Sequence, residues 1–182
     1  MSLPLEKFLQ LELSSCHRNC NKGIIIQPSL RNFSQWQVYI FPSEGVFKSC
    51  ILTFFIYFNN FPSNVPEVIF QSGVFHPYVD HSTFRFDTSP FFTEWNVQTR
   101  VYLLLNSIYD SFIDIPKPQG NSANPEAVRY LQKSLNAYEK RALEELPKHE
   151  EPNNQNEINT PKRWNAQKEK LMNSLFTQKK VQ

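Results

Sequence analysis

Four segments of strand-forming residues follow one another at short spacing, and they limit what this chain can fold into more than any other feature. They occupy residues 24–26, 35–40, 46–58 and 67–70. In the second, Trp36, Val38 and Ile40 alternate with Gln35, Gln37 and Tyr39, as in a half-buried strand. The third is apolar on both faces, so we expect a central strand, containing Cys50, that a helix covers on one side. Joined by turns, the four segments predict an antiparallel meander.

Apolar residues at helical spacing lie on both sides of these strands. Residues 3–20 predict an amphipathic helix with its apolar face at Leu5, Leu9, Leu13, Cys16 and Cys20. A second helix, ended by Pro116, is predicted from Val97, Val101, Leu104, Ile108 and Phe112. A third begins at Asn124-Pro125-Glu126, which supplies a cap, a proline at the first helical position and an acid in the first turn. Its stripe comprises Val128, Leu131, Leu135, Tyr138, Ala142 and Leu146.

Residues 73–95 have no period and are rich in aromatic rings. A loop of this length inside a compact domain is uncommon and is usually functional. Its rings cannot all lie in water, so we expect the loop to be held by its own aromatic packing. The rings are Phe75, Phe84, Phe86, Phe91, Phe92 and Trp95. Helix, four-stranded sheet, structured loop and further helices together make an α+β domain.

Charge and cysteine content exclude several classes of protein. The 182 residues include 19 basic and 17 acidic side chains, so a net charge of +2 gives no electrostatic case for nucleic acid or a membrane as the main partner. Three cysteines without a secretory signal argue against a disulfide framework. The most apolar run, residues 50–58, falls short of the roughly 20 residues that span a bilayer. We expect a cytoplasmic or nuclear protein without membrane insertion.

The order of elements and several short motifs resemble the ubiquitin-conjugating enzyme fold over residues 3–146. The motifs are Phe61-Pro62 with Pro66, Val68 and Phe70; Phe75-His76-Pro77; Trp95; and Asn124-Pro125-Glu126-Ala127 with Tyr130. The resemblance implies that His76 and Pro77 belong to the family's His-Pro-Asn motif and that Trp95 follows the active-site segment. From its chemistry, His76 is expected to be a structural residue whose ring bonds loop backbone.

The resemblance also shows what is missing. The family's nucleophile is a cysteine ten residues after the motif histidine, and that position holds Phe86 here. No cysteine follows Cys50 in the sequence, and thioester chemistry requires a thiolate. The motif asparagine, taken to stabilise the oxyanion, is replaced by Tyr78. We therefore expect that this chain is not an enzyme. Residues 84–95 are expected either to pack on themselves and fill the volume of the lost site or to present a binding patch.

Other candidate sites are weaker. His76 with His81, or Cys16-His17-Cys20, lacks the ligands and spacing of a metal site, so we expect no metal and no cofactor. Cys16 and Cys20 are expected to be small buried hydrophobes. A hydrolytic triad of Ser89, Asp87 and His81 has no support in its spacing.

Among inactive ubiquitin-conjugating enzyme variants, the chain is similar to the fused-toes family, also called the AKT-interacting protein family. The residues that carry this likeness are Ile26-Gln27-Pro28-Ser29, Gly45-Val46-Phe47-Lys48, Val74-Phe75-His76-Pro77, Val79-Asp80, Asn124-Pro125-Glu126-Ala127, Trp164 and Thr177-Gln178-Lys179-Lys180. The resemblance implies an adaptor or scaffold that binds Hook-type coiled-coil proteins in vesicle transport and is tied to the kinase AKT. Alternatives are a regulatory partner of an active conjugating enzyme, a ubiquitin-binding module, or a scaffold in kinase signalling.

The chain is expected to divide into three parts. A domain at residues 3–146 is followed by a polar linker at 147–160 and a helical extension at 161–182. The extension has Trp164, Leu171 and Leu175 at helical spacing, and it either packs back on the domain or grips a partner helix. The sequence does not identify the binding surface.

Overall fold

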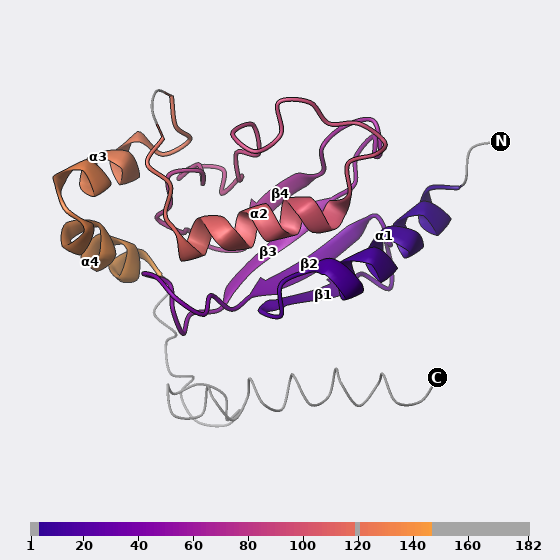
Figure 1. Ribbon diagram of the computed structural model, residues 1–182, viewed down its shortest axis with the longest axis horizontal. Helices are drawn as coiled ribbons and strands as arrows, with labels where there is room; N and C mark the ends of the chain where they lie inside the picture. The colour runs from indigo at the N-terminus through magenta and orange to yellow at the C-terminus, as the bar shows by residue number, and fades with distance from the viewer. Residues whose placement is uncertain (1–3, 119–120, 147–182) are drawn as a thin grey trace. The chain divides into compact units, whose positions relative to one another are not determined.

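Within the described residues, a helix, four strands and three further helices follow one another along the chain (Figure 1). The computed structural model describes residues 4–118 and 121–146, so the predicted linker and extension lie outside the described residues. The elements are α1 (Leu5–Asn19), β1 (Ile24–Pro28), β2 (Gln35–Ile40), β3 (Leu52–Tyr57), β4 (Glu67–Phe70), α2 (Val101–Ile113), α3 (Pro125–Lys133) and α4 (Leu135–Glu145).

The sheet is the predicted antiparallel meander, in the order β1-β2-β3-β4. Its register pairs Val38 with Phe54 and Phe54 with Phe70, which sets these three side chains in one row across the sheet. All three are buried, and alternate residues on the same strands are half-buried. The period of two therefore builds one apolar face, as expected for strands covered on one side.

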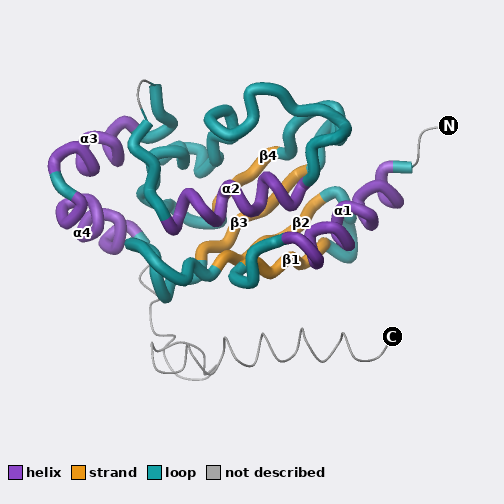
Figure 2. The backbone as a smooth tube through the Cα atoms, viewed as in Figure 1, coloured by secondary structure: helices purple, strands orange, loops and turns teal. Residues whose placement is uncertain are grey.

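Helix α2 covers this apolar face, and Figures 1 and 2 show it lying across the sheet. Leu104, Ile108 and Phe112 are fully buried, at the spacing that places them on one side of a helix. The Phe112 ring lies 5.5 Å from the Phe70 ring and 5.2 Å from the Phe47 ring, between centroids. Each such buried ring stabilises the fold by about 1.5–3 kcal/mol relative to its exposed state.

Helix α1 packs beside α2 through a buried carboxylate that the sequence analysis missed. Leu9 and Cys16 are buried as predicted, Leu5 is exposed at the helix end, and Glu12 between them is only 1% exposed. Its Oε2 accepts a hydrogen bond from the Val101 N–H at 2.9 Å, and its Oε1 lies 2.9 Å from Arg100 Nε. Glu12 therefore caps the first turn of a helix far away in the sequence.

The third strand is shorter than predicted, because residues 46–51 form turns. Gly45 and Ser49 have φ values of 75° and 70°, in the left-handed region that an extended strand cannot contain. The N–H groups of Lys48 and Cys50 accordingly bond back to Gly45 and Phe47. The strand begins at Leu52, so the prediction that Cys50 lies in the central strand was wrong: it is half-buried ahead of β3.

The predicted helix from Asn124 to Leu146 is two helices, α3 and α4. Ser134 between them has extended backbone angles, and its Oγ accepts a hydrogen bond from the Ala137 N–H at 3.0 Å. A serine that caps a new helix competes with continuation of the old one. Leu135 is consequently 57% exposed instead of lying on the buried stripe.

The start of α2 was also predicted too early. The Thr99 N–H bonds back to the Asn96 carbonyl, which closes a turn ahead of the helix. Val97 lies in this turn and is 60% exposed, so it does not belong to the buried face.

Candidate functional site

Residues 73–95 contain no named helix or strand, although the structure describes all of them. Two isolated bridges, Ile69 with Arg85 and Val79 with Phe86, fix the loop to β4 and to itself. The Phe86 N–H also donates to the Val68 carbonyl at 2.9 Å. Phe86 is thus held by backbone pairing on both sides, and its side-chain direction is set by the sheet.

His76 lies near the start of this loop, and its ring is fully buried. Its Nδ1 accepts a hydrogen bond from the Tyr78 N–H at 3.1 Å, and its Nε2 donates to the Ser111 carbonyl of α2 at 3.0 Å. These two bonds use both ring nitrogens of a neutral imidazole. Burial lowers the pKa of His76 to about 4, so the ring stays neutral at physiological pH. His76 therefore joins the loop to α2.

Phe86 and Tyr78 meet in one cluster of rings. Phe86 is only 5% exposed, and its ring centroid lies 6.1 Å from those of both His76 and Tyr78. Phe91 stacks on Phe86 at 5.9 Å and meets Tyr78 edge to face at 5.3 Å. Burial, aided by the Asp87 carboxylate, raises the pKa of the Tyr78 hydroxyl above its usual value of 10. Phe86 and Tyr78 are therefore neighbours in a packed aromatic layer.

Trp95 belongs to a second group of rings in the same loop. Its ring lies 5.3 Å from Phe92 and 6.3 Å from Phe61, measured between centroids. Its Nε1 is buried without a hydrogen-bond partner, although the side chain as a whole is half-buried. Phe61 in turn packs against Phe8 of α1 and Phe58. The end of the loop is therefore joined to the core by apolar contacts.

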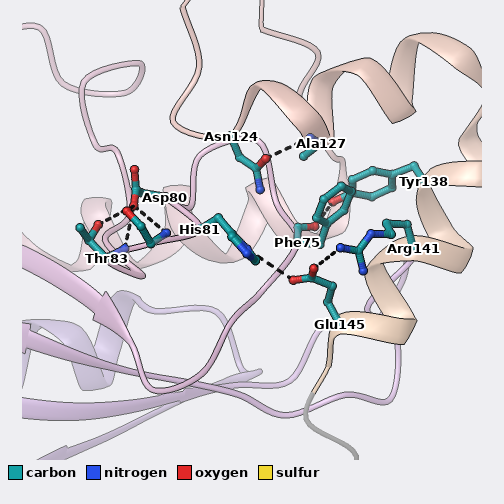
Figure 3. A network of polar contacts seen from close by, with 10 residues as sticks. Phe75, Asp80, His81, Thr83, Asn124, Ala127, Tyr138, Arg141 and Glu145 are labelled. Carbon is teal, nitrogen blue, oxygen red and sulfur yellow. Dashed lines mark hydrogen bonds and ion pairs between the residues drawn. The ribbon is translucent and has the colours of Figure 1, made fainter.

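Helices α3 and α4 hold the beginning of the loop through polar contacts (Figure 3). Asn124 donates its N–H to the Pro77 carbonyl at 3.0 Å, while its Oδ1 caps α3 by accepting from the Ala127 N–H at 3.1 Å. The Tyr138 hydroxyl donates to the Phe75 carbonyl at 2.6 Å. The predicted cap at Asn124 is confirmed, and it also anchors the loop.

A charged group on α4 faces the same loop. Glu145 pairs with Arg141 one turn earlier and lies 3.6 Å from Nδ1 of His81 (Figure 3). The Arg141 guanidinium lies over the Phe75 ring, 5.1 Å from its centroid. Nearby, Oδ1 of Asp80 accepts hydrogen bonds from the backbone and side chains of Ser82 and Thr83, which lower the pKa of Asp80 to about 2.

The other candidates are not brought together as an active site. Ser89 is exposed and donates its N–H to Oδ1 of Asp87, whereas His81 faces Glu145. Within residues 4–118 and 121–146, no three histidine, cysteine, aspartate or glutamate side chains are grouped closely enough to hold a metal ion. In the same ranges, no helix has the length and apolar character needed to cross a membrane.

Sequence reasoning missed two supports of the site, the Ser111 carbonyl and the Tyr138 hydroxyl. A main-chain carbonyl carries no residue signature, so nothing in the sequence could have pointed to Ser111. Tyr138 was assigned to the buried stripe, and a buried tyrosine hydroxyl usually finds a partner, which was the available signal.

Comparison with known proteins agrees with this architecture. A family model described as ubiquitin-conjugating enzyme matches residues 8–146. Among solved structures, one titled "Novel Ubiquitin-Conjugating Enzyme" superposes with a TM-score of 0.64 at 23% identity, covering 74% of this chain and 90% of its own. Ubc12 of S. cerevisiae gives a TM-score of 0.62 at 17% identity, covering 74% and 75%. At these identities the structural likeness establishes the fold.

Two curated relatives share the name AKT-interacting protein. AKT-interacting protein of Danio rerio is 28% identical over 148 residues, and that of Homo sapiens is 26% identical over 148 residues. Each alignment covers 78% of this chain and 49% of the relative, so the chain spans about half the length of these proteins. The chain belongs to the ubiquitin-conjugating enzyme family and, within it, is a conjugating-enzyme variant similar to the AKT-interacting proteins.

Proposed function

We propose that this chain is a catalytically inactive ubiquitin-conjugating enzyme variant that works as a protein-binding adaptor. The observation that carries the proposal is the burial of Phe86 among His76, Tyr78 and Phe91. Phe86 stands at the position that holds the nucleophilic cysteine in active members, and Tyr78 stands at that of the oxyanion asparagine. A phenylalanine ring cannot form a thioester, and a tyrosine hydroxyl donates a hydrogen bond with a geometry different from that of the oxyanion asparagine.

The remaining cysteines do not offer a substitute. Cys16 is fully buried in α1, and its contact with the Cys20 side chain, with burial, raises the pKa of its thiol. Burial also raises the pKa of the Cys50 thiol. A raised pKa leaves little free thiolate at neutral pH, so neither Cys16 nor Cys50 supplies the thiolate that capture of ubiquitin requires. All three cysteines precede β3 and lie outside residues 73–95.

The ring packing within residues 84–95 bears on how the adaptor binds. Phe84, Phe91, Phe92 and Trp95 are half-buried, and none of them is among the exposed large apolar side chains of the described residues. This favours self-packing that fills the volume of the lost site over an open aromatic patch. We therefore place the partner surface elsewhere on the chain.

The family resemblance supports a role in the cytoplasm, linking vesicles to microtubule motors through Hook-type coiled-coil proteins. A second candidate, a scaffold in kinase signalling, is favoured by the name of the curated relatives, AKT-interacting protein. In either role the domain serves as a rigid binding surface for other proteins and does not transfer ubiquitin. The proposal covers only the half of those relatives that this chain matches.

The test is a tagged pull-down of the full chain from the native cell, with bound proteins identified by mass spectrometry. An identically tagged protein of unrelated fold serves as the control, and partners common to both are discarded. Recovery of a Hook-type coiled-coil protein supports the first role, and recovery of AKT with no coiled-coil protein supports the second. Recovery of only ubiquitin or an active conjugating enzyme would replace the adaptor by a regulatory subunit of ubiquitin transfer.

A further inference from the structure

Two of the three cysteines lie one helical turn apart at the end of α1. Cys20 is the C-cap of the helix, and its N–H donates to the Cys16 carbonyl at 2.9 Å, so helical geometry extends between them. Residues four apart in a helix lie on the same face, with Cα atoms roughly 6 Å apart. Disulfides join Cα atoms separated by roughly 4.4–6.8 Å, so this pair lies within bonding range. The Cys20 side chain is also close enough to Cys16 to raise the pKa of the Cys16 thiol.

The backbone around Cys20 is fixed against α2. The Asn106 side chain donates to the Asn19 carbonyl at 3.0 Å and accepts from the Asn21 N–H at 2.9 Å. The Asn21 side chain donates to the Asp110 carboxylate at 3.1 Å. Residues on both sides of Cys20 are thus anchored, while Cys20 itself has left the helix with a ψ of 151°. The ψ angle of Cys20 turns the chain that follows it out of the helix, while its N–H still bonds to the last turn.

The two thiols differ in accessibility. Cys16 is fully buried, whereas Cys20 is half-buried and can be reached from solvent. The nearby Cys20 side chain and burial together raise the pKa of the Cys16 thiol, which keeps its sulfur protonated. An oxidant from solvent therefore reacts with the sulfur of Cys20 first, and the buried Cys16 lies one helical turn away. This is the arrangement of a reacting and a resolving cysteine.

We propose that Cys16 and Cys20 are a reversible redox pair that closes to a disulfide within α1 when the chain meets a peroxide. The Cys20 thiolate attacks hydrogen peroxide, forming an S–O bond as the O–O bond breaks and hydroxide leaves. The Cys16 sulfur then attacks the Cys20 sulfur, the S–S bond forms, and the sulfenic oxygen departs as water with the proton of Cys16. Two thiols and one peroxide give one disulfide and two waters, and a dithiol reductant restores the two thiols by exchange while forming its own disulfide.

Closing this bond changes the contact between α1 and α2. The sulfur atoms must approach to about 2 Å, which draws Cys20 toward the last helical turn. The anchors at Asn19 and Asn21 lie directly beside it, so the movement is transmitted to Asn106 and Asp110 on the outer side of α2. This pair belongs to α1 and its cap, so the proposal is independent of whether residues 73–95 bind a partner.

The experiment uses a property of the sequence: trypsin cuts after Arg18, between the two cysteines. The full chain is treated with hydrogen peroxide, its free thiols are blocked with N-ethylmaleimide, and it is digested without reductant. The peptides 8–18 and 19–22 should then be recovered as one linked species that dithiothreitol separates. We expect this species to exceed any pair containing the Cys50 peptide, residues 49–85, by about tenfold or more because of proximity.

Three variants make the result specific. Cys50→Ser should form the linked pair as the native chain does, whereas Cys20→Ser and Cys16→Ser should give none. Hydrogen exchange at the end of α1 should change on oxidation of Cys50→Ser and not of Cys20→Ser. The proposal would be overturned if peptides 8–18 and 19–22 were recovered separately, each carrying N-ethylmaleimide, at a peroxide concentration that already oxidises Cys50. Linkage mainly between two chains or through Cys50 would also overturn it.

Discussion

The Phe86 ring meets the Tyr78 ring nearly at a right angle, 82°, with their centroids 6.1 Å apart. Edge-to-face contact is a favourable arrangement of aromatic rings and contributes about 0.5–1.5 kcal/mol beyond burial. Under the proposed function these positions correspond to the nucleophile and the oxyanion donor of active family members, and their two rings stabilise each other by packing. The contact between these two rings therefore contributes to the stability of residues 73–95.

A cysteine introduced at position 86 should not by itself allow the chain to form a ubiquitin thioester. In Phe86→Cys, the thiol enters a layer of rings closed by Phe91 and Tyr78, and no asparagine is present to stabilise the oxyanion. We expect no ubiquitin thioester on this variant when it is incubated with activating enzyme, ATP and ubiquitin and run on a non-reducing gel. A ubiquitin adduct that dithiothreitol removes from Phe86→Cys, and that is absent from Phe86→Ser, would contradict this expectation.

Truncating the same ring should cost stability. Phe86→Ala removes a nearly fully buried side chain from the cluster, and we expect the free energy of unfolding to fall by roughly 3–5 kcal/mol. Phe92→Ala is the matched control, since Phe92 is half-buried in the same loop and should cost roughly half as much or less. Urea denaturation followed by tryptophan fluorescence measures both. Equal losses of unfolding free energy in the two variants would mean that Phe86 contributes no more to packing than the half-buried Phe92.

The buried carboxylate between α1 and α2 gives a third prediction. Glu12→Ala leaves the Val101 N–H without its partner and Arg100 without its counter-charge, so we expect a loss of roughly 2–4 kcal/mol in the free energy of unfolding. Glu6→Ala, an exposed acid in the same helix, should change it by less than about 0.5 kcal/mol. If the two variants unfold at the same urea concentration, Glu12 does not cap α2.

Stability should fall as the pH is lowered below 6.5, because of His76. The unfolded chain binds a proton near pH 6.5, while burial holds the pKa of folded His76 at about 4. The contribution is therefore complete above pH 6.5 and is lost progressively down to about pH 4, by up to about 3 kcal/mol. Urea midpoints measured from pH 7 to 5 should decrease for the native chain and much less for His76→Gln. A variant with the same slope as the native chain would exclude His76 as the cause.

The cap of α3 gives the smallest expected effect. Asn124→Ala removes the acceptor for the Ala127 N–H and should lower the free energy of unfolding by about 1 kcal/mol. Asn124→Ser keeps a capping oxygen and should recover most of that loss. Comparison of the two urea curves separates capping from the backbone bond to Pro77, which neither substitution removes. Loss of equal size in both variants would show that the cap is not the cause.

The regular parts of the fold could be predicted because their periods are strong. Alternation in β2 and the three-to-four spacing in α2 each follow from one buried face, and the structure has both. The errors lie where local backbone chemistry overrides the apolar pattern. Gly45 and Ser49 turn a chain segment that is as apolar as a strand, and Ser134 caps a new helix inside a continuous stripe.

The candidate site was predictable in part. The family resemblance pointed to His76, Tyr78 and Phe86 as residues of one site, and the structure brings their rings together. The bonds that hold His76 could not be foreseen, because Ser111 contributes a carbonyl that every residue possesses. Glu12 was hidden for another reason: an isolated glutamate among leucines on a helix normally lies at the water-facing edge, and its partner Val101 is distant in the sequence.

Loading of ubiquitin onto the native chain tests the central claim most directly. The chain is incubated with activating enzyme, ATP and ubiquitin, beside an active conjugating enzyme of the same fold, and both are run on non-reducing gels. We predict a dithiothreitol-sensitive ubiquitin adduct on the active enzyme and none on this chain. A reducible adduct on this chain that disappears when Cys16, Cys20 or Cys50 is replaced by serine would contradict the account, because a thiol outside residues 73–95 would then carry ubiquitin.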